Sequence, residues 1–226
     1  MMLSDVMEDY LKAIYRLQRE REDRIKTSEI AEELSVTSPT VTSMVEKLED
    51  RGLVDREKYK GVRLTEEGRG VAIEVVRHHR LLEAYLTEHL DYDWAEVHDE
   101  ADRLEHHISE EFETRVAAAL DDPEVDPHGS PIPGADLEPP STRTGDPVSA
   151  FAEGDRVVVR EVADRDAEVL SYLADHGVEP GVSLEIREIA PFGMITARAA
   201  GHDEDVSLPE EVARHVRVAP PAEVEG

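Results

Sequence analysis

Residues 97–111, VHDEADRLEHHISEE, place histidines and acids three and four positions apart. If this segment is helical, His98, Asp102, Glu105 and His106 share one face, because residues at these spacings are neighbours on a helix. Two imidazoles and two carboxylates on one face are enough donors to hold a divalent cation. The spacing therefore predicts a metal site on a helix that spans about residues 94–107.

A second chelating pair precedes this segment. His79 and Glu83 are four apart in HHRLLE, within a helix expected over about residues 66–90. Taken alone, such a pair is typical of a solvated or hydrogen-bonded histidine. Two such groups on consecutive helices favour metal binding over that reading.

The N-terminal third shows the periodicity of a DNA-reading module. Apolar residues at helical spacing predict helices over residues 4–19, 27–34 and 38–51, and LVDREKYKGVRLT at 53–65 predicts two short strands around Lys60-Gly61. Ser28 is expected to cap the second helix, Thr37 or Ser38 the third, and Gly52 to end it. This order of elements predicts a winged helix–turn–helix.

The third helix is expected to read DNA, because small polar side chains near its N-terminus can reach base edges, whereas lysines and arginines contact phosphates. A winged helix used for protein contacts is the alternative. The predicted DNA-binding residues are Thr37, Ser38, Pro39, Thr40, Ser43, Lys47, Arg51, Lys58, Lys60 and Arg63.

The rest of the chain is expected to hold one more helix, from Ser109 to about Leu120, and then a β-rich module with one helix. The fold class is mainly α with a small β part. The expected division is a DNA-binding domain at 1–70, a helical metal-binding and dimerisation domain at 71–120, a Pro/Gly-rich linker at 121–149, a small β-barrel at 150–218 and a tail at 219–226.

Charge is distributed unevenly. Residues 1–70 carry 13 Lys and Arg against 16 Asp and Glu, a net of −3, whereas residues 71–226 carry 12 against 37, a net of −25. A DNA partner thus remains compatible with a formal charge of −28 for the whole chain. Dispersed carboxylates with only five lysines are typical of a salt-adapted cytoplasm.

The chain has no cysteine, so disulfides and thiolate metal sites are excluded. No apolar run approaches the ~20 residues of a membrane span, and the N-terminus has no secretory leader. A cytoplasmic location is expected. Nothing resembles a nucleophile elbow or a catalytic base motif, so an enzyme is not expected.

Several motifs together resemble the diphtheria-toxin-repressor family of metal-dependent transcription regulators. They are MEDYLKAIYRL, SPTVTSMVEKLEDRGLV, HHRLLE, VHDEADRLEHHIS and PHGSPIPG. The resemblance covers nearly the whole chain. It implies a winged helix, a helical metal-binding and dimerisation domain, and a C-terminal SH3-like domain. It also implies a homodimer on a palindromic operator that represses iron or manganese uptake genes, with Mn²⁺ or Fe²⁺ as corepressor and up to two ions per chain.

The resemblance also implies the ligands. The primary site would comprise Asp9, Asp102, Glu105 and His106, and the ancillary site His79, Glu83 and His98, with Glu161 and Asp164 added from the SH3-like domain. The primary set is similar to that of manganese-type members, but these place a glutamate where Lys12 stands. The ancillary set is similar to that of iron-type members. A winged-helix regulator that responds to a small molecule without metal is the alternative.

Overall fold

The computed structural model describes residues 3–20, 23–138, 145–163, 166–191 and 193–221. They fall into two compact units. The first draws on residues 1–79, 105–108 and 133–139, and the second on residues 80–104, 109–132 and 140–226. None of the helices in the described residues is long and apolar enough to span a membrane.

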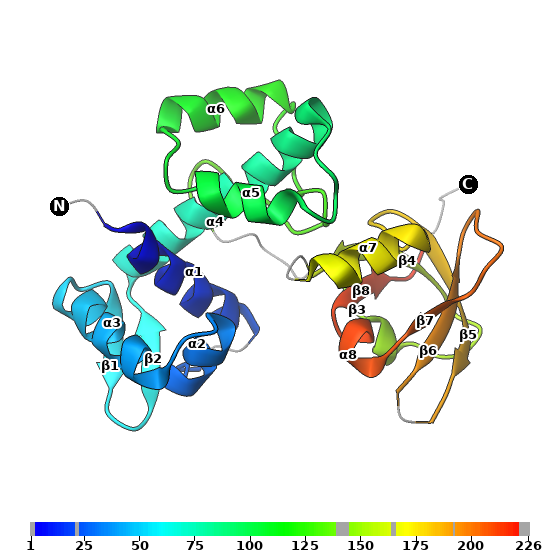
Figure 1. Cartoon of the computed structure of the whole chain (residues 1–226), viewed down its shortest axis with the longest axis horizontal. Helices are drawn as coiled ribbons and strands as arrows, with labels where there is room; N and C mark the ends of the chain where they lie inside the picture. Colours follow the sequence, from blue (N-terminus) through cyan, green and yellow to red (C-terminus); the bar gives the residue numbers. More distant parts are fainter. Residues whose placement is uncertain (1–2, 21–22, 139–144, 164–165, 192, 222–226) are drawn as a thin grey trace. The chain divides into compact units, whose positions relative to one another are not determined.

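The first unit is built on three helices and a hairpin (Figure 1). Their bounds are α1 Asp5–Glu20, α2 Thr27–Glu33, α3 Ser38–Asp50, β1 Val54–Glu57 and β2 Gly61–Leu64. The two strands are antiparallel, with Val54 opposite Leu64. This is a winged helix–turn–helix, which confirms the predicted fold of this part.

Local sequence accounts for the position of α3. Thr37 precedes it, with a side-chain oxygen 3.5 Å from the backbone nitrogen of Thr40. Gly52 follows it with a φ of +74°, a left-handed conformation that glycine adopts without steric cost. Ser28, in contrast, lies inside the first turn of α2, and Lys26 is the N-cap. The Lys26 backbone nitrogen donates to Glu29 Oε2 at 2.9 Å, so Ser28 is not the cap that was predicted.

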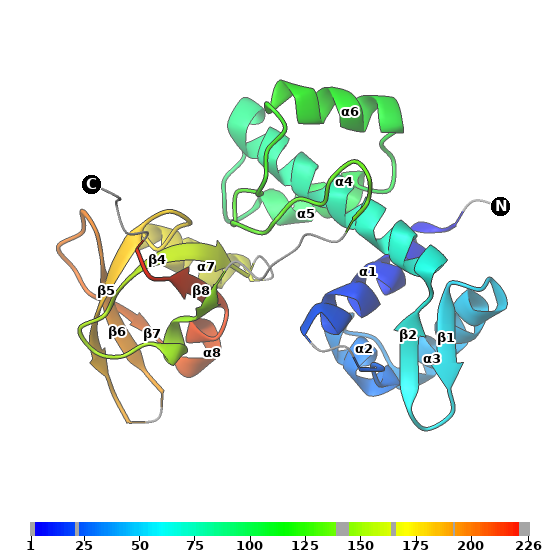
Figure 2. The ribbon, with the colours of Figure 1, turned by 180° about the vertical axis from the view of Figure 1, so that it is seen from behind.

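One continuous core supports this unit. Val41, Val45 and Leu48 of α3 are fully buried against apolar side chains of α1, α2 and the hairpin. Figure 2 shows α3 beside β1 and β2 from behind. The opposite face of α3 is left exposed, as a recognition helix requires.

The long helix α4, Glu66–Leu90, is followed by α5, Val97–Leu104, and α6, Glu110–Ala119. Ser109 caps α6, and its hydroxyl accepts from the backbone nitrogen of Phe112 at 3.3 Å. The helix α5 is shorter than predicted. It ends at Leu104, so Glu105 and His106 lie just after it and not on its face. One reason is that the carbonyl oxygen of Glu105 lies 3.1 Å from His78 Nδ1, a tertiary contact that sequence spacing does not reveal.

The C-terminal part is a six-stranded antiparallel sheet in the order β3-β8-β4-β5-β6-β7. The strands are β3 Asp146–Pro147, β4 Arg156–Val162, β5 Ser183–Ile189, β6 Ile195–Ala199, β7 Val206–Leu208 and β8 Val216–Ala219. The short η1, Val148–Ala150, α7, Ala167–Asp175, and α8, Glu210–Ala213, accompany the sheet (Figure 1). Leu170 and Leu173 of α7 complete its core. The small β module expected from alternating apolar residues is therefore present.

Residues 121–138 differ from the open linker that their prolines indicated. Asp126, His128 and Ser130 are buried, and the backbone nitrogen of Val162 in β4 donates to the His128 carbonyl at 2.9 Å. Gly129 has a φ of +84°, and a Cβ there would lie 1.9 Å from the carbonyl oxygen of Arg160, so only glycine fits. This loop is thus fixed against the β module.

Candidate metal centre

The first candidate site is centred on one ring nitrogen of His106. His106 Nε2 lies 3.0 Å from Asp9 Oδ1 and 3.4 Å from Glu105 Oε1. Helix α1 supplies Asp9, and the turn after α5 supplies Glu105 and His106. The three donor atoms lie within 4.8 Å of one another. The structure therefore brings together three of the four residues predicted for the primary site.

The other ring nitrogen fixes the orientation of the imidazole. His106 Nδ1 lies 2.7 Å from Glu8 Oε2. Metal-binding histidines commonly donate the second ring N–H to a carboxylate, which leaves the first nitrogen directed at the ion. Glu8 is placed to accept such a hydrogen bond from His106. Glu8 was not predicted as a site residue, because its sequence signal is limited to its place next to Asp9.

Charge and burial shift two pKa values in this cluster. The hydrogen bond to Asp9 raises the pKa of His106 to about 9, burial acts against it, and Glu8 and Glu105 add to the increase. For Glu105, burial raises the carboxyl pKa, but the hydrogen bond from His79 and the charge of Lys12 outweigh it, so the pKa is lowered overall. Glu105 is thus an anion, and His106 holds a proton at neutral pH that a metal ion has to displace.

The donor set fits a hard divalent cation. Donors bound to one ion at about 2.1 Å lie about 3.0 Å apart in an octahedral arrangement and about 3.4 Å apart in a tetrahedral one. The separations at His106 Nε2 are 3.0 and 3.4 Å. Carboxylate and imidazole donors without thiolate suit Mn²⁺ and Fe²⁺.

Asp102, the fourth predicted member, lies on α5 in the second unit. One oxygen of its exposed carboxylate is 3.8 Å from His98 Nε2. Its place in the primary site stays a prediction.

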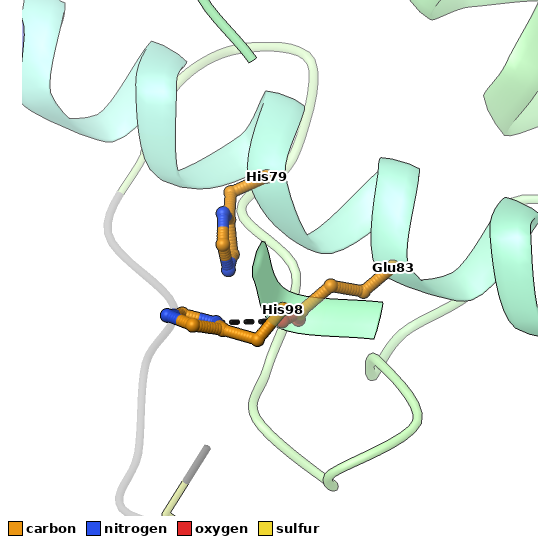
Figure 3. Close-up of side chains that lie close together, drawn as sticks. All are labelled: His79, Glu83 and His98. Atoms are coloured by element: carbon orange, nitrogen blue, oxygen red, sulfur yellow. Dashed lines mark hydrogen bonds and ion pairs between the residues drawn. The ribbon is translucent and has the colours of Figure 1, made fainter. Parts of the chain in front are cut away.

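The ancillary group centres on Glu83, which is fully buried in α4. His98 Nδ1 lies 3.0 Å from Glu83 Oε1, and Figure 3 shows His79, one turn earlier on α4, beside the same pair. A divalent cation would offset the cost of burying the Glu83 carboxylate, and imidazoles beside it could complete the ligand set. Spacing predicted all three as candidate ligands, and the family resemblance placed them in one site.

Two further donors near Glu83 were not predicted, because they lie in the expected linker. His128 Nδ1 is 3.7 Å from Glu83 Oε2, and Asp126 completes a buried group whose donor atoms lie within 4.8 Å. His128 Nε2 is 2.9 Å from the carbonyl oxygen of Trp94. The histidine inside PHG was the available signal, but prolines and glycines on both sides indicated a flexible segment.

The β module reaches this loop through Glu161. Its carboxylate accepts from Ser130 Oγ at 2.7 Å and lies 3.9 Å from Arg217 Nε. Glu161 therefore contacts the loop that carries Asp126 and His128. Asp164 lies outside the described residues.

The predicted DNA-contacting residues lie on the exposed face of α3 and on the hairpin. Those on α3 or at its N-cap are Thr37, Ser38, Pro39, Thr40, Ser43 and Lys47, and the others are Arg51 after the helix and Lys58, Lys60 and Arg63 on the wing. All are exposed. Wing cations already contact acids: Lys60 Nζ is 2.5 Å from Glu57, and Arg63 Nε is 2.9 Å from Asp55.

A winged helix joined to carboxylate–histidine clusters defines a class of metal-dependent DNA-binding regulators. Comparisons with known proteins agree. Residues 2–62 match the model of the iron-dependent repressor N-terminal DNA-binding domain, and residues 65–134 match that of the metal-binding and dimerisation domain. Residues 147–220 match the FeoA domain.

Full-length relatives identify the family. The chain is 36% identical over 234 residues to the iron-dependent repressor IdeR of Mycobacterium tuberculosis, covering 96% of this chain and 97% of that one. It is 36% identical over 225 residues to the diphtheria toxin repressor of Corynebacterium glutamicum, covering 96% of each. The chain belongs to the iron-dependent repressor family, whose members are DNA-binding transcriptional regulators and not enzymes.

Solved structures give the same result. A manganese-dependent transcriptional repressor in complex with manganese aligns with a TM-score of 0.86 at 38% identity, over 95% of this chain and 99% of that one. The manganese regulator SloR aligns with a TM-score of 0.78 at 34% identity, over 97% of this chain and 100% of that one. The relative IdeR is thus named for iron, whereas these two structures are named for manganese.

Proposed function

We propose that this chain represses iron or manganese uptake genes in the cytoplasm, as a homodimer on a palindromic operator, with Mn²⁺ or Fe²⁺ as corepressor. The main observation behind this proposal is the contact that Asp9 makes. Asp9 belongs to α1 of the winged-helix module, yet its carboxylate lies 3.0 Å from His106, which follows the last turn of α5. An ion bound here would therefore affect the position of the DNA-reading helices.

The proposed primary ligands are Asp9, Asp102, Glu105 and His106. A bound divalent ion supplies the positive charge that balances these carboxylates at short range. Without it, protonated His106 contacts both Asp9 and Glu105, and Lys12 contacts Glu105. Differential affinity for the DNA-competent pose is what lets the ion shift the equilibrium towards operator binding.

The proposed ancillary ligands are His79, Glu83 and His98, with Asp126 and His128 as further metal donors beside the buried Glu83 carboxylate. Support comes from the burial of Glu83 between two imidazoles, 3.0 Å from His98 and 3.7 Å from His128. We expect Glu161 to act through the loop, because its carboxylate accepts a hydrogen bond from Ser130 Oγ there. Asp164 remains a predicted ligand from family resemblance alone.

A gel-shift titration tests the function. We expect purified protein to bind operator DNA with Mn²⁺ or Fe²⁺ and to release it with chelator. Asp102→Ala should abolish the metal-dependent binding, whereas Glu161→Ala should only weaken it. Equally tight binding in chelator would refute a metal switch. Metal analysis that finds no bindable ion would favour a regulator that responds to a small molecule.

A further inference from the structure

Lys12 is a buried cation inside the candidate metal centre. Its side chain is 7% exposed, and its ammonium nitrogen lies 2.8 and 2.7 Å from the two oxygens of Glu105, which is 1% exposed. Removing both charges from water is costly, so such a pair persists only where its geometry is good. Both oxygens of a candidate metal ligand therefore already contact a positive charge.

Helix α1 delivers this cation to the same place as a metal donor. Lys12 lies three residues after Asp9, so the two side chains project from one face of the helix. Lys12 Nζ is also 3.3 Å from His79 Nδ1, and that nitrogen is 2.6 Å from Glu105 Oε2. Glu105 Oε2 thus faces both Lys12 and His79, whereas Oε1 contacts Lys12 and lies 3.4 Å from His106 Nε2.

We propose that Lys12 is a tethered cation that limits the Asp9–Glu105–His106 group to one divalent ion. The inference rests on the proposed function, because it takes these three residues to be the ion's ligands. A second ion bridged by Glu105 towards His79 would lie within a few ångströms of the ammonium group. Repulsion between positive charges at that distance is strong where water is scarce. The ammonium group occupies the position that a second ion would take, and Glu105 has little charge left for one.

A purely structural salt bridge would have different consequences. Its removal would lower stability but leave the number of bound ions and their affinity unchanged. The proposal instead predicts that the charge at position 12 sets the ion count. Three substitutions separate these effects: Lys12→Arg keeps the charge, Lys12→Met removes it, and Lys12→Glu reverses it.

The experiment counts Mn²⁺ bound by the full-length protein, using the EPR signal of free Mn²⁺. We expect Lys12→Glu to bind one ion more per chain than the wild type, and Lys12→Met to bind its first ion about tenfold more tightly. Lys12→Arg should keep the wild-type count. Lys26→Glu is the matched control, because Lys26 is an exposed lysine at the N-terminus of α2 and should leave the count unchanged.

An unchanged count in Lys12→Glu together with unchanged affinity in Lys12→Met would overturn the proposal. If those variants do not fold, His98→Ala, which removes a proposed ligand of the ancillary site, still decides. At saturating Mn²⁺ the centre should then give the signal of an isolated ion, and a spin-coupled pair at this centre would overturn the idea. Wild-type DNA binding that ignores Mn²⁺ would contradict the proposed function instead, and an ion gained by Lys12→Glu would even then support the role of Lys12.

Discussion

Glu8 and Asp9 contact opposite nitrogens of the same imidazole. His106 Nδ1 lies 2.7 Å from Glu8 Oε2, and Nε2 lies 3.0 Å from Asp9 Oδ1. Because Glu8 and Asp9 are adjacent on α1, this one histidine ties the first helix to the turn after α5 through two contacts. The carboxylate of Glu8 holds the ring, and the carboxylate of Asp9 faces the proposed place of the ion.

This relationship predicts a loss of metal affinity in Glu8→Gln. The amide cannot hold the ring N–H as a carboxylate does, and loss of such outer contacts typically costs about 10- to 100-fold in affinity. Calorimetric titration with Mn²⁺ measures the effect. Asp5→Asn is the control, since Asp5 lies on the same helix but 4.0 Å from His107 instead. Equal affinities in wild type and Glu8→Gln would show that Glu8 does not position the ligand.

The raised pKa of His106 predicts that the stability of the metal-free protein depends on pH. The folded value is about 9, against an unfolded value near ~6.5. The stabilisation is therefore fully present below about pH 6.5 and is lost as pH rises through about 9, with an upper limit of about 3 kcal/mol. Urea unfolding at pH 6, 8 and 10 measures it, in chelator. His106→Gln should flatten this alkaline loss, and a wild type no less stable at pH 10 than at pH 6 would contradict it.

The lowered pKa of Glu105 predicts a pH dependence of stability with the opposite sign. Its carboxyl pKa is lowered in the folded state, so its contribution is present above the unfolded pKa and is lost as pH falls through the folded pKa. In the same unfolding series, Glu105→Gln should lose stability at neutral pH and show a weaker further loss in acid than the wild type. A parallel acid loss in both proteins would mean that other carboxyls account for it.

Sequence patterns predicted most of the winged helix because its signals are local. Thr37 and Gly52 mark the ends of α3, and the burial of Val41, Val45 and Leu48 follows from spacing alone. The β module was equally visible, from apolar residues alternating along its strands.

The centre itself was only partly predictable. Spacing placed Glu105 and His106 on a helix face, but α5 ends at Leu104 and tertiary contacts position both residues. Glu8 gave no separate signal, and Lys12 stood out only through the family resemblance, because acids and lysines on an amphipathic helix are normally solvated. Which of them are buried depends on partners almost a hundred residues away in the chain. Asp126 and His128 were concealed in the same way by their proline-rich surroundings.

The exposed face of α3 predicts how Lys47 contributes to DNA binding. A lysine that contacts phosphate adds to affinity for every sequence and to the salt dependence. Lys47→Ala should weaken binding to operator and to unrelated DNA by a similar factor and reduce the slope of log K against log salt by about one. Fluorescence anisotropy in Mn²⁺ at several KCl concentrations measures both, with Lys26→Ala as the control. Weakened binding to the operator alone would instead make Lys47 a base-reading residue.

The acid load of residues 71–226, with a net charge of −25, predicts that salt stabilises the fold. Carboxylates of like charge repel one another in the compact state, and the Debye length falls from about 10 Å at 0.1 M to about 3 Å at 1 M salt. The melting temperature of the metal-free protein should therefore rise with KCl, with most of the electrostatic part reached by about 1 M. NaCl at equal ionic strength should give a similar early rise in melting temperature, because screening does not distinguish the two cations. Sucrose at matched osmolality is the second control, and with it the melting temperature should not level off as it does with salt. A melting temperature that stays flat or falls over this range would show that the carboxylates are spaced too widely for their repulsion to matter.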